Sequence, residues 1–171
     1  MPASAFANRG GISMAGDIER RLRELGIDLP AAAAPAANYV PFIVAGSAVY
    51  CAGQLPVWNG ELRYSGRLGE EVSLEEGQAA ARLCALNLVA QVKAACDGNL
   101  DRVLRVVRLG VFVNSTADFT DQPRVANGAS DLMVEVFGDT GRHARSAVGV
   151  NVLPLGVAVE VDGIFEIGNS S

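Results

Sequence analysis

Apolar and polar residues alternate near the end of the chain in a way that predicts two β-strands. The segment "HARSAVGVNVLPLGVAVEVDGIFEI" (residues 143–167) places two apolar runs on either side of "LPLG" (153–156). Proline at the second position and glycine at the fourth suit a type I turn. The pattern therefore predicts a terminal hairpin in which Gly149 lies opposite Glu160.

Side chains alternate between the two faces of a strand, so this hairpin has one apolar and one polar face. The apolar face consists of valines, which two helices are expected to cover: Val148, Val150, Val152, Val157, Val159 and Val161. Arg145 and Glu160 share the other face, and Gly149 leaves open space in front of Glu160. Arg145 lies roughly 13 Å from Gly149 at about 3.3 Å per residue, too far for a direct salt bridge to Glu160.

Three interpretations of this polar face follow from the pattern alone. A small carboxylated molecule and a water could lie between the arginine and the glutamate. The face could instead be a solvated sheet surface with scattered charges. It could also be covered by another subunit, and Arg145 would then need an anion, because burying an unpaired charge costs several kcal/mol.

Hydrophobic periodicity elsewhere predicts a hairpin, three helices and one more strand. A Ser73 and Glu76 capping box begins the longest helix, and Asn59-Gly60 marks a tight turn. The expected elements are a short helix (16–27), a hairpin around Gly46-Ser47 (39–56), the long helix (73–96), an inner strand (103–113) and a helix (123–136). This order predicts an α+β domain with a single mixed sheet and two helices packed on one face.

The composition of the chain reduces the number of functions that it could have. The 171 residues carry a net charge of -5, which disfavours a nucleic-acid surface. One histidine and three cysteines without a CxxC pair disfavour a metal site or a disulfide framework. No apolar run approaches the ~18 residues of a membrane span, and the N-terminus lacks a signal peptide's apolar region. We expect a cytoplasmic protein with reduced, buried thiols, whose true start is Met1 or Met14.

Several motifs together resemble the Rid (YjgF) family of imine deaminases, whose members were once labelled L-PSP endoribonucleases. They are "AGQLP" (52–56) and "ARSAVGVNVLPLGVAVEVDGIFEI" (144–167), together with the order of elements. The resemblance covers about residues 37–167 as a Rid-like domain, after an N-terminal extension (1–36) with a short helix and an Ala/Pro linker. It implies a chorismate-mutase-like fold and a homotrimer with clefts between subunits.

The resemblance also implies roles for particular residues. Arg145 matches the arginine that grips the substrate carboxylate, and Glu160 the glutamate that orients or activates water. Tyr39, Gly53 and Asn127 match residues that line the cleft. The implied reaction hydrolyses a small 2-imino acid, such as that from 2-aminoacrylate, to a 2-oxo acid and ammonia without cofactor or metal.

Two positions depart from the family pattern, and each makes the implied cleft more apolar. Ala147 replaces a cysteine thought to contribute mainly its backbone carbonyl, and Ala52 replaces a serine. A bulkier or less polar substrate would fit such a cleft.

Alternatives remain open at the level of sequence. The chain could bind small carboxylates without turning them over, as a sensor or pathway accessory; retention of both Arg145 and Glu160 favours an enzyme. Ribonuclease activity ranks below both because the chain is acidic. His143 is either a proton donor at the cleft rim or an exposed loop residue, and Cys51 is interpreted as a buried thiol rather than a nucleophile.

Overall fold

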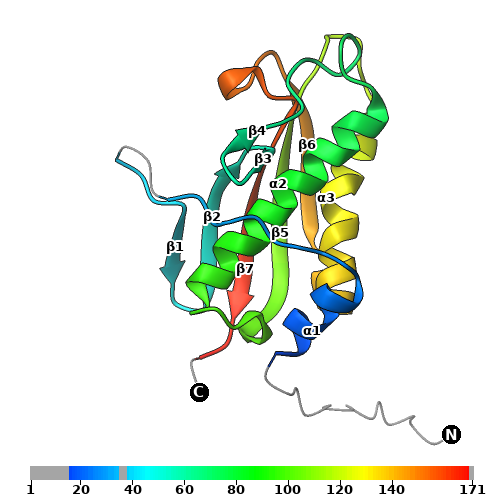
Figure 1. The fold of residues 1–171 in the computed structure, drawn as a ribbon. Coiled ribbons are helices and arrows are strands. Elements are labelled where there is room, and N and C mark those ends of the chain that lie inside the picture. The colour runs from blue at the N-terminus through cyan, green and yellow to red at the C-terminus, as the bar shows by residue number, and fades with distance from the viewer. Residues whose placement is uncertain (1–15, 35–37, 170–171) are drawn as a thin grey trace, which may run out of the picture.

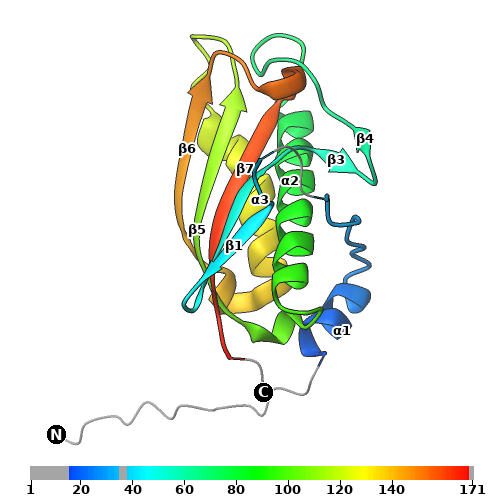
Figure 2. The same ribbon diagram turned by 90° about the vertical axis from the view of Figure 1, so that its left-hand side faces the viewer.

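A five-stranded mixed sheet forms one layer of the protein and two long helices form the other (Figures 1 and 2). The computed structural model describes residues 16–34 and 38–169, so a start at Met1 or Met14 lies outside the described residues. The strand order is β1-β2-β7-β5-β6. These strands are β1 (Phe42–Ala45), β2 (Ala48–Gln54), β5 (Val103–Asn114), β6 (Ala144–Val150) and β7 (Val159–Ile167).

The helices cover one face of the sheet and leave the other without a helix (Figure 2). They are α2 (Leu74–Ala95) and α3 (Gln122–Phe137). Helix α1 (Asp17–Glu24) packs against α3, and short 3-10 turns lie at Leu100–Arg102, Gly138–Gly141 and Pro154–Gly156. The capping box at the start of α2 is present, since Ser73 Oγ accepts from the Glu76 N–H and the Glu76 carboxylate accepts from the Ser73 N–H. The expected α+β architecture is confirmed.

Two tight turns expected from the sequence form as hairpins. Gly46 and Ser47 join β1 to β2, with Ala45 paired to Ala48. Asn59 and Gly60 join the short strands β3 (Val57–Trp58) and β4 (Glu61–Leu62). Both of those turn residues have positive φ, 48° and 88°, as the mirror-image turns of two-residue hairpins require.

The prediction of a terminal hairpin around "LPLG" is wrong. The turn itself closes, with the Gly156 N–H donating to the Leu153 carbonyl, but β6 and β7 do not pair. Strand β5 lies between them, parallel to β6 and antiparallel to β7. A strand, a helix and a second strand in sequence suit a parallel pair, because parallel strands need a long crossover connection. Helix α3 is that crossover.

This topology places Arg145 and Glu160 on opposite faces of the sheet, which corrects the expectation that they share one. Arg145 pairs with Leu109, which is buried beneath the helices, whereas Glu160 pairs with Phe112 on the other face. The expected all-valine face is split in the same way. Val159 and Val161 are buried, but Val148 is 47% exposed.

The prediction that Gly149 opens space in front of Glu160 is wrong. A Cβ on Gly149 would come within 2.7 Å of Ser115 Oγ and 2.9 Å of Gln122 Nε2. This glycine therefore allows β6 to pack closely against the end of β5 and the start of α3.

The uncovered face of the sheet, which we call the open face, is partly apolar. Ile43, Tyr50 and Val148 lie on it by strand register and are 58%, 49% and 47% exposed. Glu160 lies on the same face. Exposed apolar patches of this kind are typical of association surfaces.

None of the helices in the described part of the chain combines the length and the apolar character needed to cross a bilayer.

Candidate functional site

Arg145 projects from β6 toward α3 and is held there by three acceptors. Its Nη1 donates to Asn127 Oδ1 at 3.0 Å and to Ser130 Oγ at 3.1 Å, and its Nη2 donates to the Pro123 carbonyl at 3.3 Å. A surface hollow of about 280 Å³ lies beside this group. We call Arg145, Asn127, Ser130 and His143 the Arg145 cluster.

His143 fixes the hydroxyl that supports the guanidinium. Its Nδ1 lies 2.7 Å from the Gly141 carbonyl and its Nε2 lies 2.9 Å from Ser130 Oγ. A carbonyl only accepts, so Nδ1 carries a proton; in the neutral ring Ser130 then donates to Nε2 while it accepts from Arg145. His143 lies in the loop before β6, as one interpretation held, but its ring is half-buried and hydrogen-bonded rather than exposed.

Glu160 lies at the start of β7 on the open face, directly over Gly53. A Cβ at Gly53 would overlap Glu160 Oε1, so a side chain here would displace the carboxylate from its present position. The pairing of β2 with β7 is irregular between Cys51 and Gln54, which brings the backbone of residue 53 against the carboxylate. Gly53 therefore has the role that the sequence had suggested for Gly149.

The carboxylate of Glu160 has no hydrogen-bond donor or cation within residues 16–34 and 38–169. Burial, and after it the charge of Asp162, raises the pKa of Glu160 above its ordinary value of 4.5. The Asp162 carboxylate itself lies 3.5 Å from Arg108 Nη1. A carboxylate with a raised pKa and no partner is a better base than an ordinary surface glutamate.

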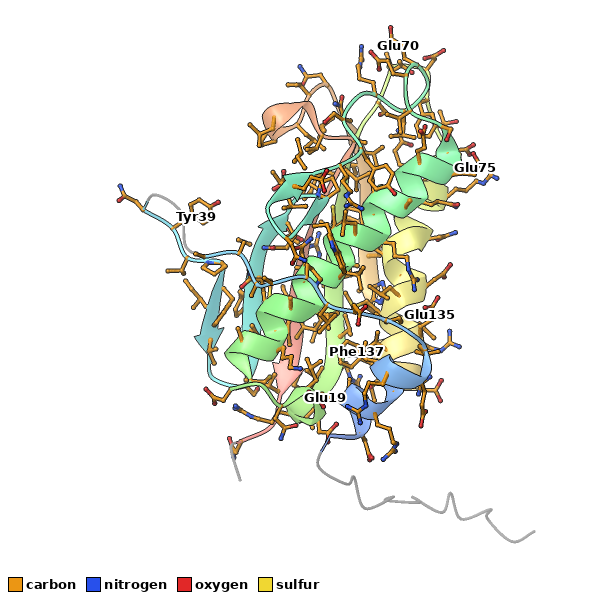
Figure 3. All side chains as sticks on the ribbon, viewed as in Figure 1. Glu19, Tyr39, Glu70, Glu75, Glu135 and Phe137 are labelled. Atoms are coloured by element: carbon orange, nitrogen blue, oxygen red, sulfur yellow. The ribbon has the colours of Figure 1, made fainter. Side chains whose placement is uncertain are left out.

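Tyr39 lies just before β1 at the margin of the molecule (Figure 3). It and Gly53 line a common cavity of about 190 Å³. We call Glu160, Gly53 and Tyr39 the Glu160 cluster.

The residues expected at the site thus form two groups within one chain. Arg145 and Asn127 come together on the helix side of the sheet, whereas Gly53 lies against Glu160 and lines a cavity with Tyr39. Ala147 shares the helix side with Arg145 and packs against the core. Strand β5 separates the two clusters, so one chain does not bring Arg145 and Glu160 to a common ligand.

Ser130 was missed from the sequence, although a signal was available. It follows Asn127 by three residues, and such residues share a face of a helix. Once Asn127 is placed near Arg145, Ser130 is expected there as well.

The buried thiols and the acidic side chains suggest no further chemistry. All three cysteines are free and buried, and burial raises the pKa of Cys51 to about 12, which argues against a nucleophilic thiolate. Within the described ranges, no group of three or more His, Cys, Asp or Glu side chains is arranged to hold a metal ion.

The fold and the two clusters define a small α+β protein with an arginine and a glutamate on separate strands. Residues 19–166 match the family model described as "YjgF/chorismate mutase-like, putative endoribonuclease". The chain therefore belongs to the Rid (YjgF) family.

Individual relatives support this assignment. Protein TCP17 of Trypanosoma cruzi is 55% identical over 155 residues, which are 90% of this chain and 96% of that protein. The crystal structure of Atu1372 from Agrobacterium tumefaciens, of unknown function, has 48% identity and a TM-score of 0.83, covering 88% of this chain and 92% of its own.

Two more distant solved structures bear on chemistry. E. coli TdcF with bound serine has 25% identity and a TM-score of 0.56, covering 82% of this chain and 94% of its own. RidA from an Antarctic Psychrobacter has 29% identity and a TM-score of 0.55, covering 80% and 94%.

Proposed function

We propose that the protein hydrolyses small 2-imino acids to 2-oxo acids and ammonia in clefts between subunits of a homotrimer. The Arg145 cluster of one subunit and the Glu160 cluster of the next form each site. This arrangement explains why the two clusters lie apart within one chain. It also gives the exposed apolar side chains of the open face a partner surface.

Each group in the clusters has a defined part in this reaction. The guanidinium of Arg145 binds the substrate carboxylate, with its orientation preset by Asn127 and Ser130. Glu160 accepts a proton from a water molecule as the water oxygen bonds to the imine carbon. With the imine nitrogen protonated, this addition gives a neutral carbinolamine. Glu160 returns its proton to the carbinolamine nitrogen, and the carbon–nitrogen bond breaks as the hydroxyl oxygen becomes the carbonyl oxygen and gives its proton back to Glu160. Ammonia leaves and the 2-oxo acid remains.

One observation carries the catalytic part of the proposal: the half-buried carboxylate of Glu160 has no donor and packs against the backbone at Gly53, where the missing side chain leaves it room. A carboxylate used only for structure is normally paired, because burial without a partner is costly. The reaction needs no cofactor, and the free, buried thiols are consistent with a cytoplasmic location.

A second candidate is a non-catalytic binder or sensor of small carboxylates. The presence of serine in TdcF favours it, since serine is not an imine. The Arg145 cluster would suffice for such a role, whereas the unpartnered Glu160 would serve no purpose.

An imine-trapping assay tests the proposal. An amino-acid oxidase generates imines in situ, semicarbazide competes for them, and 2-oxo acid release is followed with and without the protein. We expect acceleration by the wild type and a much smaller one by Arg145→Ala. Failure of the wild type with every side chain tried would leave the binder, and a sedimentation mass near that of a monomer would remove the intersubunit site.

A further inference from the structure

The segment after α1 forms one wall of the cavity beside the Glu160 cluster. We call residues 27–34 the strap; it crosses α2 on its way toward β1 (Figure 1). The Ala31 N–H donates to Asn59 Oδ1 at 2.9 Å, and the Ala33 carbonyl accepts from Gln91 Nε2 at 3.1 Å. These bonds hold the strap against the β3–β4 turn and against α2.

Helix α1, from which the strap runs, is anchored as well. The carboxylate of Asp101 accepts the backbone N–H groups of Gly16, Asp17 and Ile18 at 2.6, 3.0 and 2.9 Å. Backbone N–H groups in the first turn of a helix have no acceptor within the helix, so Asp101 acts as the cap of α1 from a distant part of the chain. The strap is therefore fixed at its origin and along its length.

The cavity beneath the strap has a volume of about 190 Å³. At about 30 Å³ per water in the liquid, it holds about six non-hydrogen groups. Its lining comes from the strap, the end of β2 and the middle of α2: Ala33, Ala34, Tyr39, Pro41, Gly53, Gln54, Leu55, Val57, Asn87 and Gln91. Gly53 lines this cavity and also lies against the Glu160 carboxylate, so a single residue joins the cavity to the proposed base.

Four polar side chains line this cavity, and Asn87 and Gln91 are the most deeply buried of its three amides. Asn87 and Gln91 are 5% and 1% exposed. Their nitrogens donate to backbone carbonyls, including that of Val57 at 2.7 Å from Asn87 Nδ2. Their oxygens accept from no donor in the described parts of the chain. Neither oxygen is fully buried, so each is open to accept an N–H or O–H from a ligand in the cavity.

We propose that this cavity receives the side chain of the substrate and selects uncharged side chains that end in a hydrogen-bond donor. The imine of glutamine is of this class. The described lining contains no Arg, Lys, Asp or Glu, so the isosteric imine of glutamate would bury an unpaired carboxylate there, which is costly. This inference rests on the proposed function and names the substrate class of the same site.

Matched substrates and a matched pair of variants test it. The wild type should have a kcat/KM at least tenfold higher for the imine of glutamine than for that of glutamate. Ala34→Leu fills the cavity and should lower the glutamine-to-alanine ratio of kcat/KM at least tenfold. Ala31→Leu alters an exposed strap residue that does not line the cavity and should leave the ratio within twofold.

Equal wild-type rates for the glutamine and glutamate imines would overturn the inference, as would an unchanged ratio in Ala34→Leu. If the wild type hydrolyses no imine, the proposed function fails by itself. The cavity is then tested by calorimetry with the 2-oxo acid of glutamine and with pyruvate. Selective loss of the longer ligand in Ala34→Leu would support the cavity, and equal affinities in both proteins would refute it.

Discussion

The two clusters differ in how the chain satisfies their charges. Arg145 donates hydrogen bonds to three acceptors on α3 and is ready to bind before any ligand arrives. Glu160 has no donor in the described chain and is held over Gly53 with its pKa raised. A binding group gains from preorganisation, whereas a base gains from being left without partners. The contrast therefore matches the clamp and base roles proposed for them.

The largest expected effect on the rate comes from replacing Glu160, the group without a hydrogen-bond donor. Glu160→Gln keeps the shape of the side chain but removes the base, so kcat should fall about 10²- to 10⁴-fold. Binding of a 2-oxo acid, measured by calorimetry, should stay nearly unchanged. Asp162→Asn, on the same face two residues later, is the control and should retain most of the rate. A large loss of affinity in Glu160→Gln would mean that the glutamate binds rather than catalyses.

The next largest effect is on ligand binding and comes from replacing Arg145. Arg145→Ala removes charge-assisted hydrogen bonds worth about 1.5–3 kcal/mol, so the Kd for a 2-oxo acid should rise about tenfold to a hundredfold. Arg124→Ala, an exposed arginine of α3 paired with Asp121, serves as the control and should not change the Kd. Equal affinity in wild type and Arg145→Ala would refute the clamp.

A smaller effect on binding is expected from replacing Ser130, whose hydroxyl accepts a hydrogen bond from Arg145. Ser130→Ala removes one acceptor of Arg145 and leaves His143 Nε2 without its hydroxyl, which should weaken binding about twofold to tenfold. Ser146→Ala, on the other face of β6, should have no effect on the Kd. If Ser130→Ala also binds like wild type, the hydroxyl does not orient the guanidinium.

The smallest effect concerns pH and stability. Because the folded chain holds the Glu160 proton more tightly than the unfolded chain, stability should fall as pH rises from the ordinary pKa of 4.5 through the raised value. Glu160→Gln lacks this loss, so its advantage in denaturant unfolding should grow from acid to neutral pH. A constant difference across that range would contradict the raised pKa.

The rate should have the opposite pH dependence from the stability. Deprotonated Glu160 is the active form, so kcat should rise through the raised pKa. Asp162→Asn removes the second cause of the shift and should move this rise toward acid.

Local features of the fold could be predicted well. The capping box at Ser73 and the turns at Gly46 and Asn59 depend on neighbouring residues, which the sequence displays directly. The parity of β7 was also predictable, because Val159 and Val161 alternate with Glu160 along a single strand. These elements form as expected.

The prediction of a terminal hairpin failed because strands far apart in the sequence compete to pair with one another. The turn at Pro154 is compatible with pairing β6 to β7, but β5 pairs with both and lies between them. The face that Arg145 occupies depends on Leu109 of that intervening strand. No pattern within residues 143–167 contains this information.

The candidate site divides in the same way. From the sequence, the family resemblance already indicated that Arg145 and Glu160 belong to one kind of site. The folded chain was needed to place Gly53 rather than Gly149 against the glutamate, and to bring Ser130 and His143 to the arginine. The physical reason is that such contacts join segments far apart in the chain, and their geometry exists only once β5 has separated the two strands.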